Sequence, residues 1–305
     1  MRWQGRPKSD NVEDRRNMSA SGGGQGGGEG LLRLLPMAVK MLGIKGTVVA
    51  VLCLGAYGLF SGNLGAMLSL LQGGGGVPAG GTSQQPLLET AAERELADFV
   101  SVILADTEET WTGLFTQKGK TYEKPRLVLF RDAVDSACGM AESAVGPFYC
   151  PADRQVYIDL SFFEQLQHRF KVPGDFAQAY VIAHEVGHHV QTLLGISGKV
   201  QAARKQLDEA AGNKLLVQLE LQADCFAGVW AYHADAGRQL LEAGDVEEGL
   251  AAASAVGDDT LQKQAKGHVT PDSFTHGSAA QRTEWFSAGL RSGDMDRCST
   301  FAKAF

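Results

Sequence analysis

The spacing of hydrophobic and polar positions changes along the chain, and in its middle part it predicts strands. Residues 126–130 (RLVLF) form a short apolar run, which is typical of a buried strand. Residues 154–160 (RQVYIDL) alternate apolar and polar side chains, which is typical of a strand with one exposed face. Because helical spacing dominates elsewhere, the pattern predicts an α+β domain that is mostly helical with a small sheet.

Apolar positions that recur three or four residues apart predict helices around these strands. We expect helices over residues 87–115, 162–170, 176–194 and roughly 200–234, followed by a helical C-terminal part. Ser161 and Glu164 have the spacing of a capping box for the second of these helices. Asp175 is expected to cap the third helix, which should end at Gly195.

One uncharged stretch stands apart from this pattern. No charged side chain occurs over residues 46–88, and residues 47–60 are almost wholly apolar. Continued to Leu71, the stretch can supply the roughly 20 residues that cross a bilayer. A buried helix is the alternative, but the Gly/Ser/Pro tract that follows at once offers no surface for packing. We therefore expect one membrane-spanning segment.

The basic residues around this segment predict its orientation. Lys40 and Lys45 flank its start, and no basic residue follows it until Arg94. The positive-inside rule therefore places the N-terminus in the cytoplasm and the C-terminal part across the membrane. The expected parts are a cytoplasmic N-terminal tail (1–45), a transmembrane signal anchor (46–71), a Gly/Ser/Pro linker (72–85) and an exported domain (86–305).

The charge of the chain argues against one class of partner. The formal net charge is −7, and residues 1–45 carry eight Lys/Arg against four Asp/Glu, a net of +4 that leaves −11 for the rest. A surface that binds nucleic acid needs a clustered basic face, so we expect no nucleic-acid partner.

The cysteine positions agree with export. Cys53 lies in the apolar stretch, which leaves an even number in the expected exported domain. In an oxidising compartment these would form two disulfides. Cys138 and Cys150 bracket a short loop and are paired first, and Cys225 with Cys298 follows by elimination. Four free thiols are the alternative if the topology is different.

The sequence AHEVGHHV (183–190) places polar rings within the predicted helix over 176–194. His184 and His188 are four residues apart, so their rings project from one face and can chelate one Zn²⁺ ion at about 2.0 Å each. Glu185 is displaced from that face and can reach a water molecule that zinc acidifies. The flanking residues are apolar, so an unused His-Glu-His cluster would carry a heavy desolvation cost.

A hydrolytic zinc site needs a third protein ligand and an open fourth position. Glu220 and Asp224 lie four residues apart, on or beside the apolar face of the next predicted helix. We expect Glu220 to complete the metal site and Asp224 to accept the free ring N–H of a ligand histidine. The alternative is that Glu220 is a solvated helix charge and that Asp224 bonds to Arg204 or Lys214.

These two motifs, H-E-x-x-H and E-x-x-x-D on a second helix, resemble those of the gluzincin metallopeptidases. The closer resemblance is to a bacterial family of neutral zinc metallopeptidases, which are single-pass membrane proteins with an exported catalytic domain. It covers nearly the whole chain and is carried by the segments MRWQGRPKSDNVEDRR, GPFYCPADRQVYIDLSFF, AYVIAHEVGHHVQTLLGI, LELQADCFAGVWA and FTHGSAAQRTEWFSAGL. The gap between the two motifs is longer than in thermolysin-like enzymes, so their specificity pockets are not transferred to this chain.

The resemblance implies a zincin fold, one Zn²⁺ ion and a peptidase site at His184, Glu185, His188 and Glu220. It implies a place in the bacterial cytoplasmic (inner) membrane, with the catalytic domain on the periplasmic side, but little about the substrate. A protein or peptide substrate is expected from the peptidase-type site itself. The oligomeric state is not predicted.

A peptidase also needs a group that stabilises the oxyanion of the tetrahedral intermediate. His276 lies in a Ser/Thr/Gly loop within one of the family-like segments and is expected to take this role. Arg282 and Tyr157 are the next candidates for stabilising the oxyanion. The alternative for His276 is a surface or capping histidine.

His189 points off the chelating face and is expected to be a neighbour of the ligands. The histidines without a partner pattern, expected at the surface, are His168, His233 and His268.

The strand over 154–160 is a candidate for substrate binding, because peptidases of this class hold an extended substrate along a sheet edge. An ordinary core strand is the alternative, and the sequence does not separate the two.

Two functions from different classes are compatible with these motifs. The first is a membrane-anchored zinc metallopeptidase, in which Glu185 activates the water and later protonates the leaving amine. The second is a non-catalytic exported binding module with a structural zinc. A non-peptidase zinc hydrolase is also compatible, because the motif fixes water activation and not the bond broken. Glu185 favours an enzyme, since a structural zinc does not need it.

Overall fold

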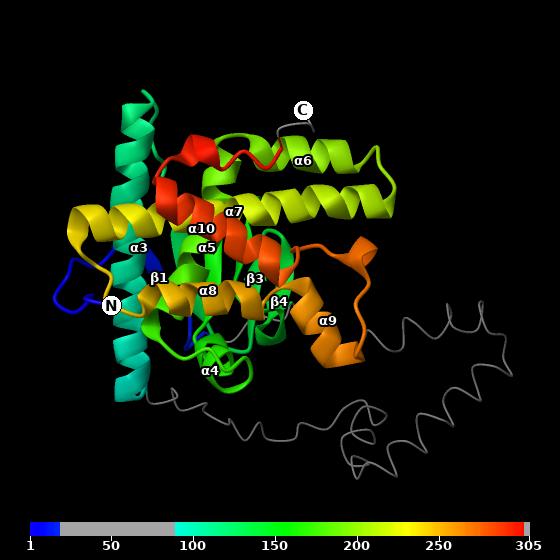
Figure 1. The fold of residues 1–305 in the computed structure, drawn as a ribbon. Coiled ribbons are helices and arrows are strands. Elements are labelled where there is room, and N and C mark those ends of the chain that lie inside the picture. The colour runs from blue at the N-terminus through cyan, green and yellow to red at the C-terminus, as the bar shows by residue number, and fades with distance from the viewer. Residues whose placement is uncertain (19–88, 302–305) are drawn as a thin grey trace, which may run out of the picture. The chain divides into compact units, whose positions relative to one another are not determined.

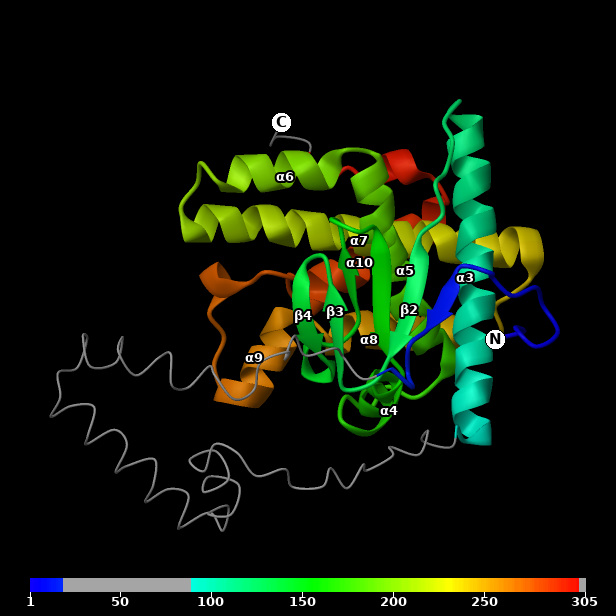
Figure 2. The ribbon, with the colours of Figure 1, turned by 180° about the vertical axis from the view of Figure 1, so that it is seen from behind.

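The structure, a computed structural model, describes residues 1–18 and 89–301 of the chain. The predicted anchor (46–71) and linker (72–85) lie outside the described residues, as does most of the predicted tail. None of the described helices combines the length and the hydropathy that a membrane crossing requires. Helices gather on one face of a small sheet (Figure 1), and the view from behind shows the sheet in front of them (Figure 2). The predicted α+β class is confirmed.

Four strands form the sheet, in the order β1 (Val12–Asp14), β2 (Arg126–Phe130), β6 (Gln155–Asp159) and β5 (Phe148–Cys150). β1, β2 and β6 run parallel, and β5 runs antiparallel to β6. β2 is the predicted buried strand, because every residue after Arg126 is buried. The edges of the sheet are therefore β1 and β5.

β6 corresponds to the strand predicted over 154–160, but it is an interior strand rather than an edge. It pairs with β2 on one side and with β5 on the other, and it is buried after its first residue. The polar positions suggested an exposed face, yet they are buried with local partners. The Tyr157 hydroxyl donates to Asp153 at 2.7 Å, and Asp159 accepts two backbone N–H groups. The core-strand alternative is correct.

A two-stranded hairpin lies beside the sheet. It consists of β3 (Ala133–Ser136) and β4 (Gly139–Glu142), and a short 3₁₀ turn, η1 (Ser143–Val145), leads from it into β5. The Cys138–Cys150 disulfide ties the turn of the hairpin to β5 and confirms the first predicted pairing. The hairpin is thus fixed covalently to an edge of the sheet.

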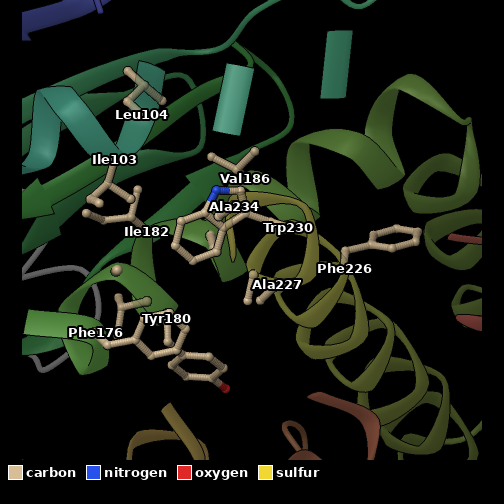
Figure 3. Packing of buried hydrophobic residues seen from close by; sticks show 14 of the residues in the cluster. Ile103, Leu104, Phe176, Tyr180, Ile182, Val186, Phe226, Ala227, Trp230 and Ala234 are labelled. Carbon is tan, nitrogen blue, oxygen red and sulfur yellow. The ribbon is translucent and has the colours of Figure 1, made fainter. Parts of the chain in front are cut away.

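Three long helices carry the core: α3 (Ala91–Gln117), α5 (Asp175–Leu193) and α7 (Glu209–Arg238). Figure 3 shows Trp230 of α7 among apolar side chains of α3 and α5. Trp230 is fully buried, and its indole N–H donates to Asp106 at 2.8 Å, so its one polar atom is satisfied.

The C-terminal part is fastened to α7. The disulfide between Cys225 and Cys298 confirms the second predicted pairing and joins α7 to the end of the described chain. Helix α10 (Ala279–Ser292) packs so closely on α7 that a Cβ atom on Gly228 or Gly289 would collide with the backbone of the facing helix. This close packing brings α10 to the buried side of α7.

The other described helices are α4 (Ser161–His168), α6 (Ile196–Arg204), α8 (Asp245–Ala255) and α9 (Asp258–Lys266), with the 3₁₀ turns η2 (Pro271–Ser273) and η3 (Met295–Arg297). The single helix predicted over 200–234 is wrong, because Asp208 caps a new helix by accepting a backbone N–H of its first turn. The predicted capping box does not form, since Ser161 is already the first residue of α4. Asp175 is likewise the first residue of α5 rather than its cap.

Residues 1–18 form part of the folded domain, so the separate tail predicted over 1–45 does not hold for this segment. β1 pairs with β2, and the ring of Trp3 packs edge-on against Phe99 of α3 with 5.4 Å between centroids. A strand of only three residues shows no period from which it could be predicted.

Candidate metal centre

Helices α5 and α7 bring the predicted metal ligands together. His184 and His188 lie one turn apart on α5, and Glu220 lies on α7. The two helices approach closely at Gly187, where a Cβ atom would lie 3.0 Å from the backbone oxygen of Ala223. The three side chains are therefore positioned by helix packing and not by a loop.

These side chains direct one donor atom each toward a common point. His184 Nε2 lies 3.1 Å from one carboxylate oxygen of Glu220, and His188 Nε2 lies 3.3 Å from the other. In a tetrahedral zinc site with bonds of about 2.0–2.1 Å, neighbouring ligand atoms are about 3.3–3.4 Å apart. These two distances run to different oxygens of Glu220, and one ligand atom from each of the three residues lies within 4.8 Å of the others, so the donor types and their grouping are compatible with one Zn²⁺ ion.

The other ring nitrogen of each histidine has its own acceptor. His184 Nδ1 lies 2.8 Å from Asp224 Oδ1, and His188 Nδ1 lies 2.9 Å from Gln191 Oε1. Each acceptor favours a proton on Nδ1, so that Nε2 presents its lone pair to a metal. Asp224 lies where the sequence predicts it. Gln191 was not predicted, although its spacing of three residues from His188 places it on the same face of α5.

Asp224 is completely buried and shares its charge with Arg282 of α10. The guanidinium donates to both carboxylate oxygens, at 2.8 and 2.9 Å, and the Tyr180 hydroxyl donates to one of them. Burial raises the pKa of Asp224, but Arg282 and the ligand histidine outweigh this and hold it below its ordinary value of 3.8. Bonding of Asp224 to Arg204 or Lys214, the alternative from the sequence, is wrong.

The electrostatics of the ligand set favour a cation. Burial lowers the pKa of His184, but the carboxylates of Asp224 and Glu220 outweigh burial and raise it to about 10. Burial raises the pKa of Glu220, yet the two ligand histidines hold it well below its ordinary value of 4.5. A site that holds positive charge this strongly on its rings can exchange that charge for a divalent metal.

Glu185 has the position of a proton acceptor rather than of a ligand. Its side chain is buried but lines the same cavity as the three donors. Its carboxylate forms no hydrogen bond or ion pair with any residue in the described part of the chain. It is therefore available to a molecule in the cavity.

The cavity has a volume of about 500 Å³, which is within the usual range for a ligand site. β5 contributes Phe148 and Tyr149 to its lining, and Phe162 of α4 and the following Phe170 add further aromatic surface. The edge strand beside the metal ligands is therefore β5 and not the predicted strand over 154–160.

His276 lines this cavity and is held by Asp258 of α9. One Asp258 oxygen lies 3.3 Å from the ring Nδ1, and the other accepts the backbone N–H of His276 at 2.6 Å. The side chain is 52% exposed, and the hydrogen bond that its ring donates to Asp258 raises its pKa above the ordinary value of 6.5. Of the next candidates for stabilising the oxyanion, Tyr157 does not line the cavity, and Arg282 lines it but is bonded to Asp224.

The remaining histidines lie outside the ligand cluster. His189 is fully buried, with Nδ1 3.1 Å from the Tyr149 hydroxyl and Nε2 2.6 Å from the backbone oxygen of Glu123. It is a neighbour of the ligands, as predicted. His168 and His268 are exposed as expected, whereas His233 is half-buried and lies 2.8 Å from a backbone oxygen.

The family described as "Putative neutral zinc metallopeptidase" matches residues 1–301, and this chain belongs to it. Uncharacterized protein YpfJ of Escherichia coli K12 is 49% identical over 306 residues, which cover 100% of both chains. Uncharacterized protein Rv2575 of Mycobacterium tuberculosis H37Rv is 42% identical over 249 residues, 74% of this chain and 83% of the relative. No solved structure matches the chain. The resemblance stated from the motifs is confirmed.

Proposed function

We propose that this protein is a zinc-dependent metallopeptidase, in which His184, His188 and Glu220 hold one Zn²⁺ ion and Glu185 transfers protons. One observation carries the proposal: two histidine nitrogens and a carboxylate oxygen, within 4.8 Å of one another, open into a cavity that an unbonded carboxylate also lines. A structural zinc has four protein ligands and needs neither the cavity nor Glu185. These features favour the enzyme over a non-catalytic binding module.

The residues around the cavity divide the work of hydrolysis. Zinc, when bound, polarises the scissile carbonyl and acidifies a water molecule. Glu185 accepts the proton of that water and delivers it to the leaving amine nitrogen. Asp224 and Gln191 hold the ligand rings in orientation. His276, whose pKa is raised by its hydrogen bond to Asp258, donates a hydrogen bond to the substrate oxygen that becomes negative.

The position of β5 supports a proposal about the substrate class. This strand is an edge of the sheet within the described residues, so its outer backbone groups can pair with an extended peptide. Phe148 and Tyr149 on the same strand line the cavity, which offers apolar surface to a substrate side chain. We therefore propose a protein or peptide substrate rather than a small polar ester or amide.

We further propose that the domain acts outside the cytoplasm. Disulfides form and persist in oxidising compartments, and the described part of the chain has two, at Cys138–Cys150 and Cys225–Cys298. Attachment to the membrane through residues 46–71 stays a prediction from hydropathy.

Glu185→Gln tests the catalytic proposal. The amide has nearly the same size but cannot take up the proton, so hydrolysis of an unfolded protein should fall roughly 10²–10⁴-fold. Zinc content and thermal unfolding should stay as in the unaltered protein. Glu209→Gln, an exposed change at the start of α7, is the matched control and should keep full activity.

Two results would separate this proposal from its alternatives. If Glu185→Gln retains both zinc and full peptide hydrolysis, Glu185 is not the base and the proposal fails. If the unaltered protein carries one zinc per chain but cleaves no peptide bond, with or without a chelator, the binding module is supported instead.

A further inference from the structure

The N-terminal segment is an integral part of the domain that carries the metal centre. β1 pairs in parallel with β2, with Val12 opposite Leu127. The pairing continues on both flanks, since the N–H of Leu127 donates to the oxygen of Asn11 at 2.9 Å and the N–H of Arg15 donates to the oxygen of Leu129 at 2.8 Å. Residues 11–15 therefore complete the sheet at one edge.

Polar contacts of the same segment are buried inside the domain. The Ser9 hydroxyl and the Asn11 amide both donate to one oxygen of Glu108 at 2.7 Å. Ser9 also exchanges two hydrogen bonds with Ser101 of α3, each of 3.0 Å. Glu108 is only 4% exposed, so a domain without residues 9–11 would leave this carboxylate short of partners. Among the described residues, only Lys124, at 2.9 Å, would remain as its donor.

The two ends of the chain that flank residues 19–88 lie at one corner of the domain. Arg16 donates to Glu89 at 2.6 Å, and Glu89 is the first described residue after that segment. Arg16 is itself buried and also donates to Asp14. The chain therefore leaves the domain and returns to it at neighbouring points.

This arrangement is incompatible with a single membrane crossing. One crossing would put residues 1–18 and 89–301 on opposite sides of a hydrocarbon layer about 30 Å thick, and the hydrogen bonds between β1 and β2 could not form. A second copy of the chain could not supply β1 either, because its own N-terminus would lie on the same opposite side.

We infer that residues 1–18 and 89–301 fold together in one compartment, on the same side of any membrane to which the chain is attached. The orientation predicted from Lys40 and Lys45, with the N-terminus across the membrane from the domain, is thereby replaced. Because both disulfides lie in this domain, the common compartment is the extracytoplasmic one.

The exposed ion pair between Lys8 and Asp98, at 2.6 Å, provides the test. In full-length protein with Cys53→Ser, a single Lys8→Cys or Asp98→Cys would be probed in intact spheroplasts with a membrane-impermeant maleimide. Both thiols should react to the same extent before lysis.

The double variant, with Lys8→Cys and Asp98→Cys, should also be cross-linked by a short bis-maleimide. The matched control joins Lys8→Cys with Lys263→Cys on α9, which lies on the other side of the domain from the N-terminal segment (Figures 1 and 2) and should not be cross-linked.

The outcomes decide the inference. Labelling of Asp98→Cys in intact spheroplasts, with Lys8→Cys labelled only after lysis and no cross-link, would mean a single crossing and overturn it. Labelling of both positions only after lysis, with the cross-link present, would uphold the shared compartment but place it in the cytoplasm. Since the pair is exposed and both residues lie on the surface, neither substitution should prevent folding.

Discussion

The helix pair α5–α7 and the sheet carry different parts of the candidate site. The helices hold the candidate metal ligands, two of them one turn apart on α5 and the third on α7, with Gly187 allowing the two axes to approach. The sheet supplies β5 to the cavity and is completed at its far edge by β1, more than a hundred residues away from its partner strand. The chemistry of the site is thus encoded locally, whereas the surface that receives a substrate depends on segments assembled from the whole chain.

The two regions also differ in how their charges are balanced. Asp224, inside the helix pair, is fully buried and paired with the buried Arg282, so both charges depend on one another. Asp258, at the cavity rim, pairs with a half-exposed His276. A change in the first region should therefore affect metal binding and stability together, and a change in the second should affect mainly the reaction.

The largest effect is expected from the sheet. A fragment of residues 86–305 lacks β1 and leaves Glu108 short of hydrogen-bond donors. The free energy of unfolding lost with these contacts should be comparable with that of a whole domain, about 5–15 kcal/mol. We expect this fragment not to fold. A chain in which about eight Gly/Ser residues replace 19–88 should fold and bind one zinc, because such a linker spans up to about 27 Å and Arg16 contacts Glu89.

Thermal unfolding followed by circular dichroism, with zinc content per chain, measures both proteins. The linked chain is the matched control for the fragment, since the two differ only by residues 1–18, by the linker and by residues 86–88, which the linker replaces. A cooperative transition at the same temperature in both would show that β1 is dispensable and would remove the contrast between the two regions.

The sequence allows the metal centre to be predicted because its signals are local. His184 and His188 share one helical face, and Glu220 is an acidic residue beside an apolar face. Both signals can be found in the sequence without knowledge of the fold. β1 gives no such signal, since a three-residue strand has no period and its partner strand lies far along the chain. The partner of His276 was not predicted either, because the path of the loop between Asp258 and His276 determines whether the two side chains meet.

The next largest effect is expected inside the helix pair. Asp224→Asn removes the charge that orients His184, so zinc affinity should fall about 10–100-fold. It also leaves the Arg282 guanidinium buried without an ionised partner, which should lower the free energy of unfolding by roughly 3–5 kcal/mol. Competition with a chromophoric chelator and urea denaturation measure the two quantities.

Gln191→Ala is the comparison for this variant. It removes the acceptor that orients His188, so zinc affinity should fall by a similar factor. The cost in stability should be smaller, about 1–3 kcal/mol, because only neutral hydrogen bonds are lost. Equal destabilisation by the two variants would mean that the Asp224–Arg282 pair has no special part in joining α10 to the centre.

The smallest effect is expected at the rim, where Asp258→Asn should change the pH dependence of hydrolysis and leave zinc binding intact. The hydrogen bond that the His276 ring donates to Asp258 raises the pKa of His276, so in the unaltered protein the ring stays charged, and able to donate to the oxyanion, up to a pH above 6.5. Activity should fall as the pH rises through that raised pKa, by roughly 10²-fold or more once the donor is lost.

An asparagine at position 258 keeps one oxygen for the backbone N–H groups but removes the negative charge. The pKa of His276 should therefore drop, and the alkaline limb of kcat/KM should move to lower pH. In His276→Ala that limb should vanish altogether. If the alkaline limb stays in place in both variants, a group other than His276 stabilises the oxyanion. The cavity rim would then matter for binding substrate rather than for the chemical step.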